Sequence, residues 1–395
     1  MLTTSQSIER SFMRKVTART LVAAAASALL LISTTTAGAT GINLRAAGAS
    51  SVQTFFDKCK EDYNKVTGDT MPYNGQGSGS GKTAIGNGTA DLAFSDSKNS
   101  NQDRPANMIH IPFVAWPVAV MYNLNSTKTV NLSTETIAKI FAGKITNWSD
   151  PQIAADNNKS YQVPVYKTAG GKTVLDKDGA PVVLKYKTVK SYFTFPNQKI
   201  VVLYRSSTSG TSNNFTTAMN KLHPDVWTKP GNDSFSTAFP GNVTSDPVGF
   251  RSATTATALA QLAKDTKYSI SYNEVSYASA YGLGVANIIN AAGNAIAPNT
   301  DGVLGAFSVA DIAPTGEVSF NYANKLASQY PLTATTYALV LTKYSSAALA
   351  NSVRDAVSYY AFNCPSIADG LGFAKTTKTS DLGKVILSQL AKIGS

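Results

Sequence analysis

The 395-residue sequence contains only two cysteines and two histidines, and these are residue types that zinc and iron sites depend on. So few ligands argue against a metal site, and no cofactor is expected. His110 lies in the apolar stretch MIHIPF, where we expect a hydrogen-bonded core histidine. Cys59 and Cys364 leave two possibilities open, either one disulfide or two buried free thiols, and the disulfide requires an exported protein.

Long apolar runs are also scarce at the start of the chain. Leu21 to Ile32 is a run of about a dozen residues, whereas a membrane-spanning helix needs about 20. Small residues of the A-x-A type follow at 34–39, and four basic residues precede the run: Arg10, Arg14, Lys15 and Arg19. This order predicts a cleavable secretory signal peptide over residues 1–39 rather than a membrane anchor. No cysteine lies near the cleavage zone, so we expect a periplasmic or secreted protein without lipid attachment there.

Acidic residues are outnumbered, with 24 Asp and Glu against 35 Lys and Arg, which gives a formal charge of +11. The leader carries +4 − 1 = +3, so about +8 remains on the mature chain. Residues 159–199 alone supply +6, from eight lysines against Asp176 and Asp178. The ordinary explanation of such a run is a solvated face, and the alternative is docking to an anionic partner or surface.

After the leader, strands and helices alternate. A helix is predicted just after Ser50 and ends at Gly68, because apolar residues recur with a period of 3.6: Val52, Phe55, Phe56, Cys59, Tyr63 and Val66. The stretch INLRAAGAS before it is typical of a strand that enters a tight turn. Further strands are predicted in MPYN, LAFSDS, IPFVAWPVAVMYNL (a buried strand pair or a crossover), IVVLYR, YSISYNE and TTYALVLTK. Helices are predicted in LSTETIAKIFAGKI with a Ser133 or Thr134 cap, SNNFTTAMNKL and SVRDAVSYYAFN.

This alternation predicts an α/β protein with open, mostly parallel sheets. Residues 159–199 interrupt it, because their β-like runs are separated by the turn signals AGG and DKDG. We predict one or two surface hairpins there.

Four short loops rich in glycine and hydroxyl residues follow predicted strands: GASS at 48–51, GSGSG at 77–81, FSDS at 94–97 and RSSTSGT at 205–211. Ligands bind at this edge of open α/β sheets. Three of the loops lead into helix starts, whose free N–H groups and partial positive charge suit an oxyanion. Arg205 adds one full positive charge, and its planar fork can bind two oxygens.

Asp96 is the exception in these loops, since a carboxylate repels an anion. It is understandable if the ligand carries a proton, because the carboxylate then accepts a hydrogen bond from the ligand O–H. Phosphate is protonated near neutral pH and sulfate is not. The sequence therefore favours phosphate over sulfate as the anion, through one residue that repels the wrong ligand.

Other interpretations of these loops exist. Each loop by itself could be an ordinary turn, and Asp96 could be a helix cap. GSGSGKT at 77–83 resembles a nucleotide P-loop but has Gln76 where the first glycine is required. Ser78 and Ser80 do not fit the G-x-S-x-G elbow, so a serine hydrolase is weakly supported.

In this order, the loops and their flanking elements resemble the phosphate-binding proteins of phosphate ABC transporters, the PstS family, and the related DING phosphate-binding proteins. The resemblance covers about residues 45–390 and rests on a collinear set of stretches: AAGAS, YNGQGSGSG, TADLAFSDS, IPFVAWPVAVMYNL, LSTETIAKIFAGKITNWSDPQIA, IVVLYRSSTSGTSNNFT, SISYNEVSYA and PLTATTYALVLTK.

The resemblance implies an α/β, two-lobed periplasmic binding protein fold of type II. Each lobe has an open mixed sheet flanked by helices, and the ligand lies in the cleft between the lobes. Lobe 1 would comprise residues 42–115 and 331–395, and lobe 2 residues 116–330 with the lysine-rich insertion at 159–199. The chain would cross between lobes near Ala115–Met121 and Pro331–Tyr337.

By the same resemblance, the phosphate site comprises Ser50, Ser51, Ser78, Asp96, Arg205, Ser209, Gly210 and Thr211. Ser50 stands where the family has a threonine, and Asp96 matches the acid that accepts the phosphate proton. Ser207 departs from the family, which carries an acid there that pairs with the arginine. Its replacement removes an orienting partner and a charge-balancing neighbour from Arg205. The insertion at 159–199 is also longer than the usual connection.

The resemblance implies a binding protein, not an enzyme, that captures inorganic phosphate and delivers it to the membrane permease of an ABC importer. We expect a monomer that binds no nucleic acid, no cofactor and no metal. Alternatives are an exported phosphomonoesterase on the same scaffold, a binding protein for another protonated oxyanion, and a surface protein that uses the basic insertion to associate with other molecules.

Overall fold

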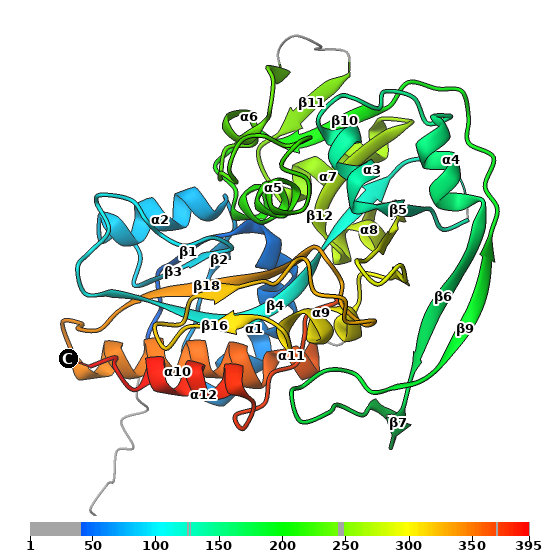
Figure 1. Cartoon of the computed structure of the whole chain (residues 1–395). Helices are drawn as coiled ribbons and strands as arrows, with labels where there is room; N and C mark the ends of the chain where they lie inside the picture. Colours follow the sequence, from blue (N-terminus) through cyan, green and yellow to red (C-terminus); the bar gives the residue numbers. More distant parts are fainter. Residues whose placement is uncertain (1–40, 125, 127, 244–248, 369, 395) are drawn as a thin grey trace, which may run out of the picture. The chain divides into compact units, whose positions relative to one another are not determined.

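A mixed sheet of nine strands organises the computed structural model, which describes residues 41–395 except 125, 127, 244–248, 369 and 395 (Figure 1). The predicted signal peptide therefore lies outside the described residues. Eight strands follow the order β11-β10-β12-β4-β18-β3-β1-β2, and β13 pairs with β4 off this path. Their bounds are β1 Ala46–Gly48, β2 Tyr73–Asn74, β3 Leu92–Ser95, β4 Met108–Tyr122, β10 Val201–Arg205, β11 Phe250–Ala253, β12 Ser269–Glu274, β13 Gly284–Val285 and β18 Thr333–Leu341.

The long strand β4 joins two groups of strands, because its two halves pair with different neighbours. Residues 108–117 pair antiparallel with β18, and residues 118–122 pair antiparallel with β12. Almost every β4 residue is buried, as its apolar sequence requires. The predicted strand pair or crossover is therefore a single strand that runs from one group to the other. The proposed lobe boundary at 115/116 falls within it, and the boundaries themselves stay a prediction.

Pairing within each group is parallel, as the sequence pattern suggests. β1 pairs in parallel with β2 and β3, and β10 pairs in parallel with β11 and β12. Within this nine-stranded sheet, the antiparallel pairs all involve β4 or β18. In consequence, the carboxyl ends of β1, β2 and β3, and that of β10, carry the four loops identified from the sequence.

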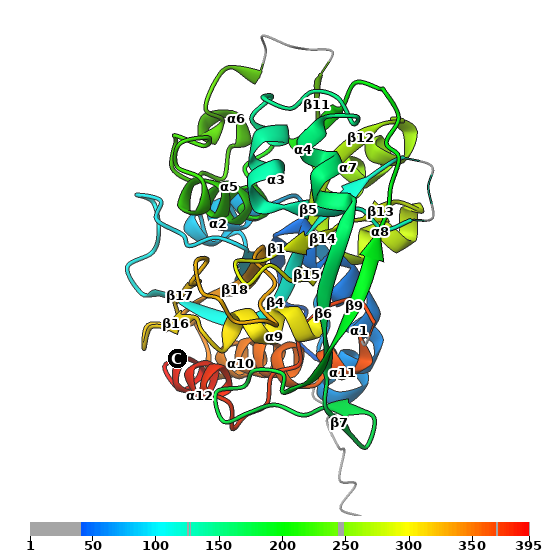
Figure 2. The ribbon, with the colours of Figure 1, turned by 45° about the vertical axis from the view of Figure 1, so that its right-hand side comes forward.

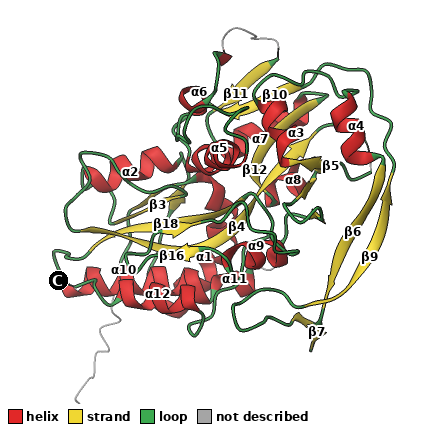
Figure 3. Ribbon diagram, viewed as in Figure 1, coloured by secondary structure: helices red, strands yellow, loops and turns green. Residues whose placement is uncertain are grey.

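Helices flank the sheet (Figure 3), and the one predicted cap and the one predicted stop are both confirmed. Ser133 Oγ accepts a hydrogen bond from Thr136 N at the start of α3, and Gly68 ends α1 with φ 77°. None of the helices among the described residues is long and apolar enough to cross a membrane. The helices are α1 Gln53–Thr67, α2 Ser78–Gly86, α3 Thr134–Phe141, α4 Pro151–Asn157, α5 Gly210–Leu222, α6 Phe235–Ala238, α7 Ala256–Asp265, α8 Ser276–Tyr281, α9 Thr300–Phe307, α10 Ala347–Phe362, α11 Cys364–Ile367 and α12 Asp381–Leu390, with a 3₁₀ turn η1 at Ser50–Val52.

A disulfide connects α1 to the C-terminal segment. Cys59 and Cys364, 305 residues apart in sequence, are bonded with their Cα atoms 5.7 Å apart. Around it, the buried rings of Phe55 and Phe56 pack against Tyr360 of α10, with ring centroids 6.3 and 4.7 Å away. The sequence left open a disulfide or two buried free thiols, and the structure contains the disulfide. It and the aromatic packing fix α1, whose start carries the first site loop.

The lysine-rich segment forms a hairpin, as predicted, that is visible as a long ribbon in Figures 1 and 2. β6 (Lys159–Tyr166) pairs antiparallel with β9 (Val183–Ser191), and the short strands β7 (Thr168–Ala169) and β8 (Lys172–Thr173) pair beyond them. Two further small sheets complete the described fold: β5 (Asn131–Ser133), β14 (Asn287–Ile289) and β15 (Ala295–Ile296) in one, and β16 (Asp311–Ile312) with β17 (Val318–Ser319) in the other.

Candidate functional site

The four predicted loops meet at one place and form two facing groups. We call Ser50, Ser51, Ser78 and Asp96 the acid half, and Arg205, Ser209, Gly210 and Thr211 the arginine half. Two hydrogen bonds connect the halves directly. Arg205 Nη1 donates to Ser50 Oγ at 3.0 Å, and Thr211 Oγ1 donates to Asp96 Oδ2 at 3.0 Å. The structure therefore brings together residues that are up to 161 positions apart (211 − 50 = 161).

Asp96 follows β3 and is a buried carboxylate surrounded by hydroxyl groups. Ser51 Oγ lies 2.8 Å from both of its oxygens, and Thr336 Oγ1 donates to Oδ1 at 2.8 Å. Thr211 supplies the third hydroxyl. Burial, with only 3% of the residue exposed, raises the pKa of Asp96, and the hydroxyl donors and the charge of Arg205 oppose that rise. The Asp96 carboxyl group therefore accepts hydrogen bonds from three hydroxyl groups, and each hydroxyl can rotate and donate to a different acceptor instead.

Arg205 ends β10 and is equally buried, at 2% exposure. Its Nε donates to the carbonyl of Thr254 at 2.8 Å, and its Nη2 donates to Ser207 Oγ at 2.9 Å. Ser207 Oγ in turn donates to the same Thr254 carbonyl at 2.6 Å. Burial lowers the pKa of Arg205 from its usual value, and arginine side chains nevertheless stay protonated in proteins. The guanidinium is therefore a fixed positive charge whose plane is set by a backbone oxygen.

Ser207 corrects one expectation from the sequence. We expected the missing acid to leave Arg205 without an orienting partner, and this is wrong, because Ser207 Oγ and the Thr254 carbonyl together hold the guanidinium. A hydroxyl and a carbonyl satisfy two donors without adding a negative charge. The other part of the expectation was that Arg205 lacks an acidic neighbour to balance its charge. The structure agrees with it, because Arg205 forms no ion pair among the described residues.

Glycine is needed where the two halves approach each other. A Cβ on Gly210, at the first position of α5, would lie 2.6 Å from Ser78 Oγ and 2.7 Å from Ser97 N. Gly77 has φ 125°, and a Cβ there would lie 3.3 Å from Arg205 Nη2. The Ser209 side chain caps α5 by accepting a hydrogen bond from Ser212 N. Hence Ser78 at the start of α2 and the start of α5 meet around Asp96.

A buried ion pair lies beside the site and also connects the halves. Lys82 Nζ, on α2, donates to Asp233 Oδ2 at 2.7 Å and to Ser97 Oγ at 2.9 Å. Ser97 Oγ donates to the other oxygen of Asp233 at 2.7 Å. The carbonyl of Asp233 accepts a hydrogen bond from Ser209 N, at the cap of α5. This cluster links α2, the loop after β3 and the start of α5.

The sequence matches a known superfamily and known proteins. Residues 33–358 match the PBP superfamily domain. Phosphate-binding protein PstS 3 of Mycobacterium tuberculosis is 30% identical over 325 residues, which cover 79% of this chain and 76% of that protein. The chain belongs to the PstS family. Phosphate-binding protein PstS of Haemophilus influenzae, a more distant relative, is 26% identical over 309 residues, covering 77% of this chain and 79% of that protein.

Solved structures show the same fold. A high-affinity periplasmic phosphate-binding protein, PfluDING, has a TM-score of 0.60 at 20% identity and covers 89% of this chain and 93% of its own. An ancestral soluble variant of the Human Phosphate Binding Protein has a TM-score of 0.62 at 19% identity, with coverage of 89% and 99%. This PstS-family chain therefore has the α/β, two-lobed periplasmic binding protein fold that its sequence predicts.

Thr336 is a site contact of this PstS-family chain that sequence reasoning missed. It lies in the buried strand β18, and its hydroxyl accepts a hydrogen bond from Trp116 Nε1 at 2.9 Å while donating to Asp96. The stretch TATTYALVL holds three threonines, which are common in strands, and nothing local distinguishes Thr336 from the other two. The pair of Lys82 and Asp233 was missed as well, because the two residues are 151 positions apart and the GSGSGKT stretch that contains Lys82 gives no sign of its partner.

Glu274, at the end of β12, is a second buried acid near the site. Ser276 N donates to its Oε1 at 2.9 Å, the Ser276 hydroxyl donates to Oε2, and that hydroxyl lies 3.0 Å from Thr54 Oγ1 of α1. Burial raises the pKa of Glu274 to about 8, with a further contribution from the charge of Asp96. With this raised pKa, the Glu274 carboxyl is mostly protonated at neutral pH.

Neither histidine is placed for catalysis at these hydroxyls. His110 Nε2 accepts a hydrogen bond from Asn99 N at 2.9 Å, and burial lowers the pKa of His110 to about 4. This confirms the prediction of a satisfied core histidine. His223 Nε2 lies 2.9 Å from Thr134 Oγ1, away from the site. Within the described ranges, no cluster of three or more His, Cys, Asp or Glu could hold a metal ion.

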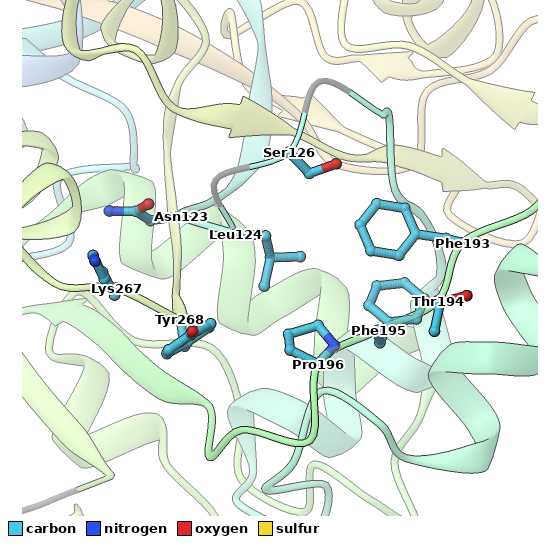
Figure 4. Close-up of a pocket in the computed structure, with 9 residues that line it drawn as sticks. All are labelled: Asn123, Leu124, Ser126, Phe193, Thr194, Phe195, Pro196, Lys267 and Tyr268. Carbon is cyan, nitrogen blue, oxygen red and sulfur yellow. The ribbon is translucent and has the colours of Figure 1, made fainter.

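A separate cavity of about 420 Å³ lies where the segment after β4, the segment after the hairpin and the start of β12 meet (Figure 4). None of the predicted site residues lines it. Its lining combines aromatic rings with one lysine: Asn123, Leu124, Ser126, Phe193, Thr194, Phe195, Pro196, Lys267 and Tyr268.

Proposed function

We propose that this protein captures inorganic phosphate between the acid half and the arginine half, and delivers it to the membrane permease of an ABC-type phosphate importer. The PstS proteins to which it is similar are named as phosphate-binding proteins. The proposed ligand contacts are Ser50, Ser51, Ser78, Asp96, Arg205, Ser209, Gly210 and Thr211.

The observation that carries this proposal is one buried acid facing one buried arginine, with hydroxyl groups between them. Arginine binds two oxygens of a tetrahedral oxyanion through its fork. Ser50, Ser51 and Thr211 now hydrogen-bond to these two charged groups, and each hydroxyl can turn to donate to a ligand oxygen instead. Backbone N–H groups at the starts of α2 and α5 supply further donors.

Asp96 gives the site its choice of anion. It can accept a hydrogen bond only from a ligand oxygen that carries a proton. Phosphate has such an oxygen near neutral pH, whereas sulfate presents lone pairs to the carboxylate and leaves it unsatisfied. An unmade hydrogen bond to a buried charged group costs about 1–3 kcal/mol or more, which corresponds to roughly fivefold to more than hundredfold in affinity.

The chain is a binding protein and not an enzyme, and the phosphomonoesterase alternative has no support. A hydrolase of this kind needs a nucleophile with an adjacent base. Ser78 Oγ instead accepts a hydrogen bond from Asp96 N at 3.1 Å. We further propose that the protein is exported through its signal peptide and works as a monomer in the periplasm or outside the cell.

Isothermal titration calorimetry of the mature protein with phosphate, arsenate and sulfate tests the proposal. We expect tight binding of phosphate and of arsenate, which is also protonated at neutral pH, and at least tenfold weaker binding of sulfate. Equal affinity for sulfate contradicts the role of Asp96. Release of phosphate from a chromogenic phosphate ester, lost in Ser78→Ala, would instead favour the phosphomonoesterase.

A further inference from the structure

The β6–β9 hairpin carries a concentration of positive charge that phosphate binding does not use. Residues 159–191 contain seven lysines and two aspartates, a net charge of 7 − 2 = +5, and no arginine. Lys177 pairs with Asp178 at the turn, whereas Lys185, Lys187 and Lys190 of β9 form no ion pair within the described part of the chain.

The same hairpin also exposes large apolar side chains. In the described part of the chain, seven large hydrophobic residues are exposed. Four of them lie within residues 159–191 and a fifth follows directly: Leu175, Leu184, Tyr186, Val189 and Tyr192. Leu184 and Tyr192 are the most open of the five, at 62% and 64% exposure. Apolar residues scattered singly on a surface are ordinary, but five within 18 residues (175–192) form a feature that needs an explanation.

β9 is the outer strand of this hairpin. β6 lies against the rest of the protein: Tyr161 is buried with its hydroxyl donating to the Asp156 carbonyl, and β6 also contacts β15. In contrast, every residue of β9 from Leu184 to Lys190 is exposed. Figures 1 and 2 show the two strands side by side, extending from the neighbourhood of α4 to the β7 turn at the opposite end.

Protection of an edge strand explains only part of this pattern. Lysines on an exposed edge prevent it from pairing with another chain, which is a common device. That device does not require leucine and tyrosine between the lysines, and exposed apolar residues on an edge work against it. Successive side chains of a strand point to opposite faces, so Lys185 and Lys187 lie on the face of β9 opposite to Tyr186. An amphipathic strand of this kind suits a membrane boundary, where the apolar side chains turn to the acyl layer and the long lysine side chains reach the headgroups.

We propose that the β6–β9 hairpin docks on an anionic phospholipid membrane. Lysine ammonium groups attract anionic headgroups without a fixed geometry, and Tyr and Leu side chains enter the boundary between headgroups and acyl chains. Specific protein interfaces favour arginine and contain few lysines, whereas all basic residues of the hairpin are lysines. The composition therefore favours a membrane surface over a protein partner. Such docking holds the protein at the membrane surface and uses none of the residues of the phosphate site.

Co-sedimentation of the mature full-length protein with lipid vesicles tests this proposal. Vesicles of phosphatidylcholine alone are compared with vesicles in which about one third of the lipid is phosphatidylglycerol, at low and at physiological salt. We expect binding only to the anionic vesicles, weakened by salt. Replacing Lys185, Lys187 and Lys190 together by glutamine should weaken binding by about a hundredfold, since each lysine near such a surface contributes a factor of about five.

Two further variants separate charge from apolar insertion. The matched control replaces three exposed lysines of α1, Lys58, Lys60 and Lys65, by glutamine, and it should retain most of the vesicle binding. The pair Leu184→Ser and Tyr186→Ser should weaken vesicle binding at constant net charge. All variants are checked for unchanged phosphate affinity by calorimetry, which shows that they fold.

Three results would overturn the proposal. One is equal binding to neutral and anionic vesicles, and another is an equal loss in the α1 control. The third is binding to a soluble polyanion such as inorganic polyphosphate that is as tight as binding to vesicles and is unaffected by Leu184→Ser with Tyr186→Ser. That last result would assign the hairpin to soluble polyanions.

Discussion

The acid half and the arginine half of the site each bury one charge, and they satisfy it in different ways. Asp96 is surrounded by three side-chain hydroxyls, which can all rotate away. The Nε of Arg205 is held by a backbone carbonyl, which cannot. Each half also contributes one hydroxyl to the other, since Thr211 donates to Asp96 and Ser50 accepts from Arg205. This difference supports our proposal that Arg205 is a fixed cation that attracts any oxyanion and that Asp96 is an adaptable acid that selects among them.

The largest effect is expected from removing the fixed cation. Arg205→Ala leaves the ligand without its only guanidinium contact, so the affinities for phosphate and sulfate should both fall by about a hundredfold or more. The ratio between the two anions should change little. Calorimetry measures this, with Arg251→Ala on the neighbouring strand β11 as an exposed control. A selective loss of phosphate alone would mean that the arginine, too, discriminates.

A smaller effect is expected from removing one hydroxyl around the acid. Thr336→Val preserves shape but takes one donor from Asp96, which should raise the pKa of that carboxyl further. Phosphate affinity should fall by roughly fivefold to tenfold, because a hydrogen bond to a charged group contributes about 1.5–3 kcal/mol and the remaining hydroxyls compensate in part. Thr335→Val is the matched control, since Thr335 Oγ1 donates to the Val114 carbonyl instead. Equal effects of the two changes would contradict a specific role for Thr336.

A still smaller effect is expected from restoring the acid at position 207. Ser207→Asp places a carboxylate beside Arg205 Nη2, which now donates to Ser207 Oγ at 2.9 Å, and the new charge partly neutralises the cation. Phosphate affinity should weaken by a few-fold, and the effect should shrink at high salt. Ser206→Asp, exposed one residue earlier, is the control. Tighter phosphate binding in Ser207→Asp would show that charge balance matters more than net positive charge.

The substitution Glu274→Gln should leave phosphate affinity nearly unchanged and should alter the pH dependence of stability instead. The pKa of Glu274 is about 8 in the folded protein against an ordinary value of 4.5, so the folded state holds this proton at pH values where the unfolded chain has lost it. Stability should therefore fall as pH rises from about 4.5 to 8. Thermal unfolding at pH 5 and pH 8 should show a smaller decrease in Glu274→Gln than in wild type. Glu61→Gln, exposed on α1, serves as the control, and an unchanged pH profile in Glu274→Gln contradicts the assignment.

The sequence was sufficient for the parts of the site that local rules govern. Glycine and hydroxyl residues at the ends of strands predicted the loops, and Arg205 with Asp96 predicted the opposite charges. Which groups satisfy those charges could not be predicted, because the answers depend on contacts between distant elements. Thr336 is 240 residues from Asp96, and the Thr254 carbonyl that orients Arg205 is a backbone atom, present in every residue type.

The fold shows the same division. Helix periods and a cap predicted α1 and α3, and turn signals predicted the β6–β9 hairpin, because these patterns are local. The division of β4 between β18 and β12 was not predicted, since a continuous apolar strand gives no sign of where its partner changes. The pairing of Cys59 with Cys364 also needed the structure, because free thiols would have fitted the sequence equally well.

The central claim is that Asp96 selects a protonated oxyanion, and Asp96→Asn tests it most directly. The amide keeps the size of the side chain, removes its charge and can donate to an unprotonated oxygen. Calorimetry of wild type and Asp96→Asn with phosphate and sulfate gives the ratio of the two affinities. We predict that the wild-type preference for phosphate is at least tenfold and narrows severalfold or more in Asp96→Asn. An unchanged ratio would contradict the account.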